Sequence, residues 1–398
     1  MKEGWTYKKL DEVGVTQTGT TPSKTNSANY GDFIPFIRPA EIPVDGSGKI
    51  NYNTEIRLSE EGVKNGRLFK TNSVLMVCIG SIGKLGYLEQ DASCNQQINV
   101  LTPNAEYDSK YVFYAMSTPA FQKESLKIAQ GAQATLPIIN KSKWSNLLIP
   151  IPPTIDEQHF IVSRLDAAFA NIDALKANAE RQLAEARKLF QAELTECMRP
   201  KEGWEEKTLK EIGLTQTGTT PSKTDPNNFG DYIPFIRPSE IDFDGCGNID
   251  YDSEIKLSER GLKIGRLFKA HSILMVCIGA TISKVGFCTQ DVSCNQQINV
   301  ITPKDEYDFK FIYYAMRNKD FRDKVIKDGT SAQATLPIIN KGKWEKLTIY
   351  CPSIEIQRQI VARLDALSVH VRQLEEVQRK SLAECDALKQ AMLREVFE

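Results

Sequence analysis

Hydroxyl, amide and cationic side chains are gathered in short segments that this 398-residue sequence contains twice. TGTTPSK at residues 18–24 places Thr20, Thr21, Ser23 and Lys24 on a loop bounded by Gly and Pro, and residues 217–223 repeat it. Hydroxyls, loop amides and a lysine suit DNA phosphates, contacts that position a protein without reading sequence. The alternative is a loop whose hydroxyls bond its own backbone. The residues leave both interpretations open.

Arginines and amides in the repeated segments could read base edges. Arg38 and its copy Arg237 stand in FIRP, where the following Pro holds the arginine extended. Such an arginine could bind guanine through two bonds, or equally bind a carboxylate. The amides can bind adenine, although amides are also common in strands and turns. The candidate DNA-binding residues are Thr20, Thr21, Ser23, Lys24, Arg38, Lys84, Gln96, Gln97, Gln133, Asn140, Lys141 and Lys143, with the copies Thr219, Thr220, Ser222, Lys223, Arg237, Lys284, Gln296, Gln297, Gln333, Asn340, Lys341 and Lys343.

Catalytic constellations are not found in the sequence. The three histidines, His159, His271 and His370, occupy no equivalent repeat positions, which excludes a duplicated histidine-dependent site. GSIGK at residues 80–84 faintly resembles the end of a phosphate-binding loop. That motif needs a glycine five residues before Gly83, where this chain has Cys78, so a tight turn is the better interpretation. We therefore predict no catalytic site and no metal site in this chain.

Composition is that of an ordinary water-soluble protein. Apolar residues make up 41% and charged residues 25%, and the net charge of −1 argues against a simple basic DNA-coating protein but not against one with local basic patches. Nine cysteines without a CxxC pair, and no export signal, predict reduced thiols in the cytoplasm.

Glycine and proline divide the chain into four blocks. All 24 Gly and 18 Pro lie in residues 1–153 or 200–353, and none lies in 155–199 or 354–398. We predict long helices there, each roughly 65 Å long at about 1.5 Å per residue. Apolar residues recur in steps of three and four, which favours a coiled-coil seam over two separate amphipathic helices. The predicted seam residues include Ile161, Leu165, Ile172, Leu175, Ala179 and Phe190 in the first helix, and Leu364, Val371, Leu388 and Met392 in the second.

The two remaining blocks carry short Val- and Ile-rich runs, Gly/Asp turns and short helical stretches. This pattern predicts an α+β fold for each. The tryptophans fall in matched pairs, Trp5 with Trp204 and Trp144 with Trp344, which we expect to be core anchors. The predicted order is a globular domain at 1–153, a helix at 154–199, a globular domain at 200–353 and a helix at 354–398. The second helix can return antiparallel to the first, giving an internal repeat with pseudo-twofold symmetry.

The sequence resembles the specificity subunit of type I restriction–modification enzymes along essentially its whole length. The resemblance rests on KEGW at residues 2–5 and 201–204, on TGTTPSK, IPFIRP, CNQQIN and QATLPIINK, and on the helix entries DEQHFIVSRLD and EIQRQIVARLD. It implies that each globular block is a target-recognition domain for one half of a bipartite DNA sequence. It also implies that the helices set the spacing and dock two methyltransferase subunits, with translocase–nuclease subunits in the full assembly.

The resemblance also implies that the chain is not catalytic and binds no cofactor, with S-adenosylmethionine, ATP and magnesium bound by the partner subunits. The two domains of such subunits usually differ strongly, whereas here they are near-copies, so we expect a near-palindromic target. On the same grounds, one domain with one helix could self-associate. The alternatives are a coiled-coil scaffold that presents two protein-binding domains, and an enzyme with an unrecognised site.

Overall fold

The computed structural model describes residues 2–130, 137–242, 245–252, 255–330 and 337–398. They form two compact units, one of residues 1–178 with 380–398 and one of residues 179–379. Each unit therefore combines one globular block with a segment of both long helices, α6 (Ile155–Cys197) and α12 (Ile354–Phe397). The long helices and the α+β blocks of the prediction are confirmed.

The globular blocks repeat the same elements in the same order. The first contains the strands β1 (Thr6–Lys9), β2 (Gly14–Thr18), β3 (Tyr30–Ile37), β4 (Arg57–Leu58), β5 (Val74–Val77), β6 (Leu85–Tyr87), β7 (Ser93–Cys94), β8 (Ile98–Pro103) and β9 (Leu148–Ile151). Its helices are α1 (Leu10–Val13), η1 (Ser27–Asn29), α2 (Glu60–Asn65), α3 (Ser109–Met116), α4 (Pro119–Gln130) and α5 (Lys141–Ser145).

The second block matches the first element by element. Its strands are β10 (Glu205–Thr208), β11 (Gly213–Thr217), β12 (Phe229–Ile236), β13 (Lys256–Leu257), β14 (Ile273–Val276), β15 (Val285–Phe287), β16 (Ser293–Cys294), β17 (Ile298–Pro303) and β18 (Thr348–Cys351). Its helices are α7 (Leu209–Ile212), η2 (Pro226–Asn228), α8 (Glu259–Ile264), α9 (Phe309–Arg317), α10 (Lys319–Thr330) and α11 (Lys341–Trp344).

A four-stranded antiparallel sheet, in the order β2-β8-β5-β6, is the centre of the first block. Successive residues of a strand point to opposite faces, and the run VLMV is buried on both. Val74 and Met76 join the core with α3 and the start of α6, while Leu75 and Val77 join a second core on the other face. The sheet β11-β17-β14-β15 is built in the same way.

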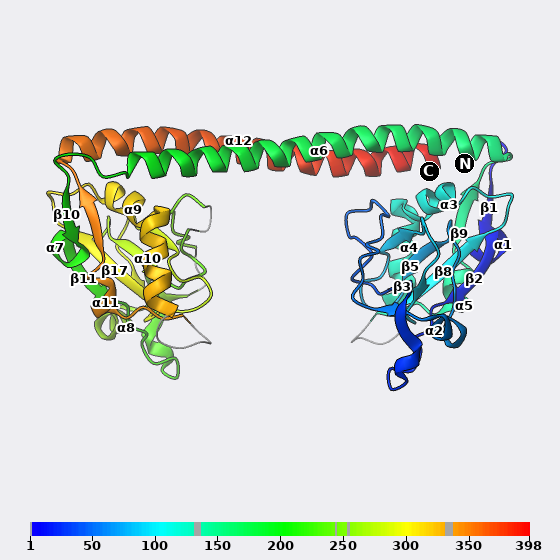
Figure 1. The fold of residues 1–398 in the computed structure, drawn as a ribbon, viewed down its shortest axis with the longest axis horizontal. Helices are drawn as coiled ribbons and strands as arrows, with labels where there is room; N and C mark the ends of the chain where they lie inside the picture. The colour runs from blue at the N-terminus through cyan, green and yellow to red at the C-terminus, as the bar shows by residue number, and fades with distance from the viewer. Residues whose placement is uncertain (1, 131–136, 243–244, 253–254, 331–336) are drawn as a thin grey trace. The chain divides into compact units, whose positions relative to one another are not determined.

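The tryptophans lie in these cores as predicted. Trp144 and Trp344 are fully buried, Trp5 is buried, and Trp204 is partly buried against the core of the second block. The α2 and α5 ends of the first block lie away from α6, whereas α3 lies close to it (Figure 1).

The helix-entry motif joins α6 to the block before it. Gln158 is buried and accepts a 2.8 Å bond from the backbone N–H of Asp108 at the start of α3. Asp166 accepts from Lys110 at 2.8 Å and from the Tyr114 hydroxyl at 2.5 Å. The second unit repeats these bonds with Gln357, Asp308, Asp365, Lys310 and Tyr314. The Gln…Arg-Leu-Asp pattern is therefore a structural joint between domain and helix.

Segments of α6 and α12 run antiparallel within each unit. In the first, Asp173 and Lys176 bind Lys389 and Asp386 respectively, so rising numbers on α6 meet falling numbers on α12. In the second, Gln182 bonds Gln378 and Arg187 binds Glu375 in the same sense.

Two predicted seam residues are wrong. Leu175 is 59% exposed and Leu388 is 50% exposed. In both helices the next residue, a lysine, takes the inward position: Lys176 reaches Asp386, and buried Lys389 reaches Asp173. A lysine can bury its aliphatic stem while its ammonium binds a carboxylate, so in the first unit the inward position that follows Ile172 belongs to Lys176. No helix among the described residues combines the length and apolar character needed to cross a membrane.

Candidate nucleic-acid interface

The turn between β7 and β8 connects three segments of the first block by backbone hydrogen bonds. The Cys94 carbonyl accepts from the Thr20 N–H at 2.9 Å, the Asn95 N–H donates to the Ile37 carbonyl at 3.1 Å, and the Gln97 carbonyl accepts from the Cys78 N–H at 2.8 Å. The second block repeats all three bonds through Cys294, Asn295 and Gln297. The duplicated segment SCNQQIN is therefore the support that fixes the neighbouring loops.

The TGTTPSK loop lies directly against this turn. A Cβ on Gly19 would come within 2.2 Å of the Asn95 carbonyl oxygen, so only glycine allows the approach. Thr21 donates from its hydroxyl to the Gln96 side chain at 2.6 Å, and Ser23 bonds Thr25 at 2.8 Å. Thr220 bonds Gln296 and Ser222 bonds Thr224 in the second block. Some hydroxyls of the loop therefore already have hydrogen-bond partners within the same block. The lysine of the loop, Lys24 in the first block and Lys223 in the second, is exposed.

Arg38 binds a carboxylate, which is one of its two predicted alternatives. Its Nη2 donates to Glu41 Oε1 at 2.7 Å, and Glu41 is buried. The hydrogen bond that Arg38 donates to Glu41 raises the pKa of Arg38. Arg237 binds buried Glu240 at 2.7 Å; burial opposes ionisation of Glu240, but the bonds from Arg237 and Ser239 lower its pKa. A base contact by either arginine stays a prediction.

The predicted amides have structural partners. Gln97 accepts from Asn95 Nδ2 at 2.9 Å, and Asn140 caps α5 by accepting from the Lys143 N–H at 2.9 Å. The equivalents Gln297 and Asn340 make the same bonds in the second block. Gln133 and Gln333 lie outside the described residues.

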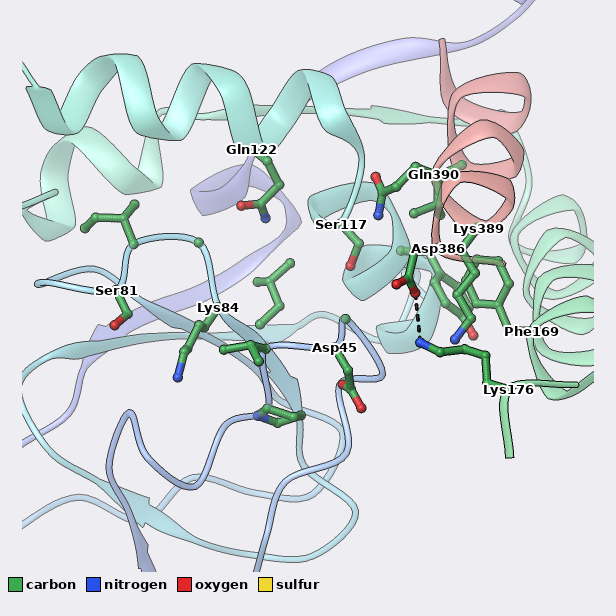
Figure 2. A pocket seen from close by; sticks show the side chains of 18 residues that line it. Asp45, Ser81, Lys84, Ser117, Gln122, Phe169, Lys176, Asp386, Lys389 and Gln390 are labelled. Carbon is green, nitrogen blue, oxygen red and sulfur yellow. Dashed lines mark hydrogen bonds and ion pairs between the residues drawn. The ribbon is translucent and has the colours of Figure 1, made fainter. Parts of the chain in front are cut away.

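Lys84 binds backbone carbonyls in the segment that follows Arg38. Its Nζ donates to the carbonyls of Pro39 and Ile42 at 3.2 and 3.4 Å, and Lys284 bonds Pro238 in the same way. Figure 2 shows Lys84 in a cavity of about 620 Å³ that is also lined by Asp45 and Gln122. DNA contact by Lys84 and Lys284 remains untested.

Lysines on α5 and α11 are exposed at the end of each block remote from the helices (Figure 1). Lys141, Lys143 and Lys343 are exposed on these short helices. Lys341, however, is paired with Glu345 at 2.8 Å. The first block has Ser145 at the position of Glu345.

An arginine that the sequence reasoning missed joins the same region. Arg67, in the repeated GRLFK segment, is exposed and donates from Nη1 to the Thr18 carbonyl. Its copy Arg266 donates to the Thr217 carbonyl at 2.8 Å. The exact duplication of GRLFK was the available signal. The aromatic side chains of Phe33 and Tyr232, 56% and 59% exposed, also went unpredicted.

These side chains can bind an anionic polymer but offer no catalytic constellation. Exposed cations surround loops rich in hydroxyls and amides, as phosphate contacts require. Burial raises the pKa of the Cys78 thiol to about 12 and that of Cys351 to about 12, so neither is a thiolate nucleophile near neutral pH. No cluster of potential metal ligands occurs within the described part of the chain.

Comparisons with known proteins agree on one family. The family described as "Type I restriction modification DNA specificity domain" matches residues 2–185 and again residues 201–384. The HindI type I restriction enzyme specificity subunit of Haemophilus influenzae is 30% identical over 151 residues, 37% of this chain and 32% of that protein. The EcoBI specificity subunit of Escherichia coli is 21% identical over 427 residues, 99% of this chain and 86% of that protein.

Solved structures share the fold. A chain from a study of complex assembly and conformational transition of the type I R-M system aligns with a TM-score of 0.79 at 17% identity, covering 100% of this chain and 98% of that chain. The HsdS subunit from Thermoanaerobacter tengcongensis aligns with a TM-score of 0.54 at 18% identity, covering 100% and 97%.

Proposed function

Because the chain belongs to the family of type I restriction modification DNA specificity domains and contains that domain twice, we propose that it reads a bipartite DNA target, one half-site per globular block. The observation that carries the proposal is the duplication of one polar interface. In both blocks one backbone bond and one Thr–Gln side-chain bond hold an exposed lysine loop against an Asn-Gln-Gln turn, and two further backbone bonds fix that turn. The function we propose is recognition of DNA, in line with the DNA specificity domain that the chain contains twice.

The near-identity of the interfaces supports a near-palindromic target. Equal loops held by equal bonds should prefer equal half-sites, and an antiparallel helix pair favours their inverted order, as in dimeric DNA-binding proteins. The loops that differ are the source of any mismatch between half-sites. One is NSANYGDF at 26–33 against DPNNFGDY at 225–232, and the other is GSIGK at 80–84 against GATISK at 279–284.

The long helices have exposed apolar residues that suit protein partners. Phe160, Leu175 and Leu388 are 61%, 59% and 50% exposed in the first unit, and Val377 is 59% exposed in the second. Apolar side chains left in water on a helix favour an interface. We assign these exposed side chains to contacts with the methyltransferase subunits, which would bind S-adenosylmethionine, while ATP and magnesium would serve the translocase–nuclease subunits.

The test is methylation-motif sequencing in cells that express this chain with its methyltransferase. We expect one bipartite motif whose halves are inverted copies, or nearly so. As a control, exchanging residues 26–33 for the sequence of 225–232 should make the halves more alike. Two halves unrelated in sequence would show that the shared loops do not read the DNA. Methylation by the purified chain alone would show that the chain is an enzyme.

A further inference from the structure

An ion pair joins α6 to α12 at equivalent places in the two units. In the first, Lys176 Nζ lies 2.8 Å from Asp386 Oδ1, a contact drawn in Figure 2. In the second, Arg187 Nε lies 2.8 Å from Glu375 Oε1. The helices align at an offset of 199 positions, so Lys176 corresponds to Glu375 and Arg187 corresponds to Asp386. Helix α6 therefore supplies the cation in both pairs, and α12 supplies the carboxylate in both.

This arrangement discriminates between partners. If α6 paired with the α6 of a second copy, Lys176 would face Arg187 twice. If α12 paired with another α12, Glu375 would face Asp386 twice. Like charges at such positions destabilise a helix pair, while opposite charges set partner choice. Lys176 is only 21% exposed, so water screens its pair less than it would screen an open surface pair.

A second set of residues, where the helices meet the blocks, has the same effect. In the second unit Arg317, at the end of α9, lies over the ring of Phe190 on α6 at 5.6 Å and donates to the Gly245 carbonyl. The corresponding residues of the first unit are Ser117 and Lys389. An α12–α12 pair would therefore bring Lys389 into the place of Phe190, against the guanidinium of Arg317.

The first unit pairs its cation and aromatic ring differently. Lys389 lies 5.4 Å from the ring of Phe169 on α6 and binds Asp173, with Ser117 nearby (Figure 2). An α6–α6 pair would put Phe190 in the place of Lys389, which would leave Asp173 without this cation. Asp173 thus keeps this cation only in a mixed pair of helices, whereas the Arg363–Glu193 pair of the second unit is not selective against a second α6, because Arg164 of α6 corresponds to Arg363.

We propose that these charges make α6 pair with α12 and reject the same helix of a second copy, so that two near-identical halves assemble with each other. The relevant partner is the other half of the chain, and the surface is selective against a second α6 or α12. This pattern opposes the sequence-based expectation that one domain with one helix self-associates. The inference does not depend on DNA being the ligand.

A charge exchange in the full-length chain tests the proposal. Lys176→Asp combined with Asp386→Lys keeps an opposite-charge pair at both native positions. The two paired positions of each helix, 176 and 187 on α6 and 375 and 386 on α12, then carry opposite charges. Position 176 would therefore attract Arg187 of a second copy, and position 386 would attract its Glu375. The control adds Arg187→Glu and Glu375→Arg. Positions 176 and 187 of α6 are then both negative, and positions 375 and 386 of α12 are both positive.

Two differently tagged copies of each variant are unfolded together, refolded and captured through one tag, and the second tag is measured. We expect little cross-capture for the wild-type chain, about tenfold more for the two-substitution variant, equivalent to about 1.4 kcal/mol, and a return to the wild-type level for the four-substitution control. Equal cross-capture by the wild-type chain and the two-substitution variant would overturn the proposal. So would a control that associates as strongly as the two-substitution variant, because the cause would then be loss of stability.

Discussion

One carboxylate distinguishes the lysine helix of the second block from that of the first, and its removal should change the salt dependence of DNA binding. Glu345 binds Lys341 at 2.8 Å and accepts from the Thr215 hydroxyl at 2.8 Å. The hydrogen bond from Lys341 lowers the pKa of Glu345, so the carboxylate is charged at neutral pH. In the first block Ser145 stands there and donates to Thr16 at 3.1 Å. Glu345→Ser gives the second block this local chemistry and frees Lys341.

The size of the effect follows from counterion release. A lysine that neutralises one more phosphate steepens the slope of log affinity against log salt by about 0.9. Between roughly 50 and roughly 200 mM salt, the advantage of the variant over the wild-type chain should therefore fall about 3.5-fold. The reverse substitution in the first block, Ser145→Glu, should flatten the slope by a similar amount.

The assay is fluorescence anisotropy of the chain with its methyltransferase on a duplex that carries the methylation motif, at four salt concentrations. Glu202→Ser removes the same charge from an exposed turn before β10 and should leave the slope unchanged. Parallel lines for the wild-type chain, Glu345→Ser and Ser145→Glu would refute the phosphate contact, and with it the placement of DNA along α5 and α11.

Three further outcomes are expected. If Arg38 positions its loop through Glu41, then Arg38→Ala and Glu41→Gln should each cost about 1–3 kcal/mol of stability and weaken DNA binding equally; weakening by Arg38→Ala alone would identify a base contact. Because Leu175 is exposed, Leu175→Ala should change stability by less than about 0.5 kcal/mol, whereas Leu175→Pro should cost about 3 kcal/mol or more, as chemical denaturation can measure. The pKa of Glu240 is lowered in the folded protein. The pair of Glu240 with Arg237 therefore contributes stability above the ordinary glutamate pKa of about 4.3, and this contribution is lost as the pH falls through the lower pKa of the folded state. The stability difference between Glu240→Gln and the wild-type chain should disappear in acid.

The architecture could be predicted because it rests on backbone rules. Glycine and proline are confined to the globular blocks, and their absence elsewhere predicts the two long helices. The phase of the helix seam could not be predicted, because periodicity favours an apolar residue and Leu175 lies beside Lys176. Only the position of Asp386 on the other helix shows that the lysine is the residue facing inward. When a seam contains polar residues, the spacing of the apolar residues alone does not identify which residues face the partner helix.

The candidate interface was predictable as a set of segments but not as individual roles. Duplicated loops pointed to the right region, and Lys24 is exposed there. The partner of Arg38 lies only three residues away in Glu41, yet guanine and a carboxylate each present a pair of acceptors to an arginine. Asn140 was predictable as a helix cap, since asparagine is favoured before the first turn. That structural role leaves Asn140 less free to bind adenine.

The first unit takes its core from residues that are far apart in sequence, which has a consequence for protein synthesis. The ring of Phe397 lies 6.4 Å from that of Trp5, and Lys2 donates to the Val396 carbonyl at 2.7 Å. At about 5–20 residues per second, the roughly 200 residues between the two parts of this unit take about 10–40 s to translate. Throughout that interval a nascent α6 has no α12, and its nearest neighbours on a polysome are other copies of α6. Repulsion between Lys176 and Arg187 acts from the moment both have left the ribosome, so it can keep neighbouring nascent chains apart until each has made its own second helix.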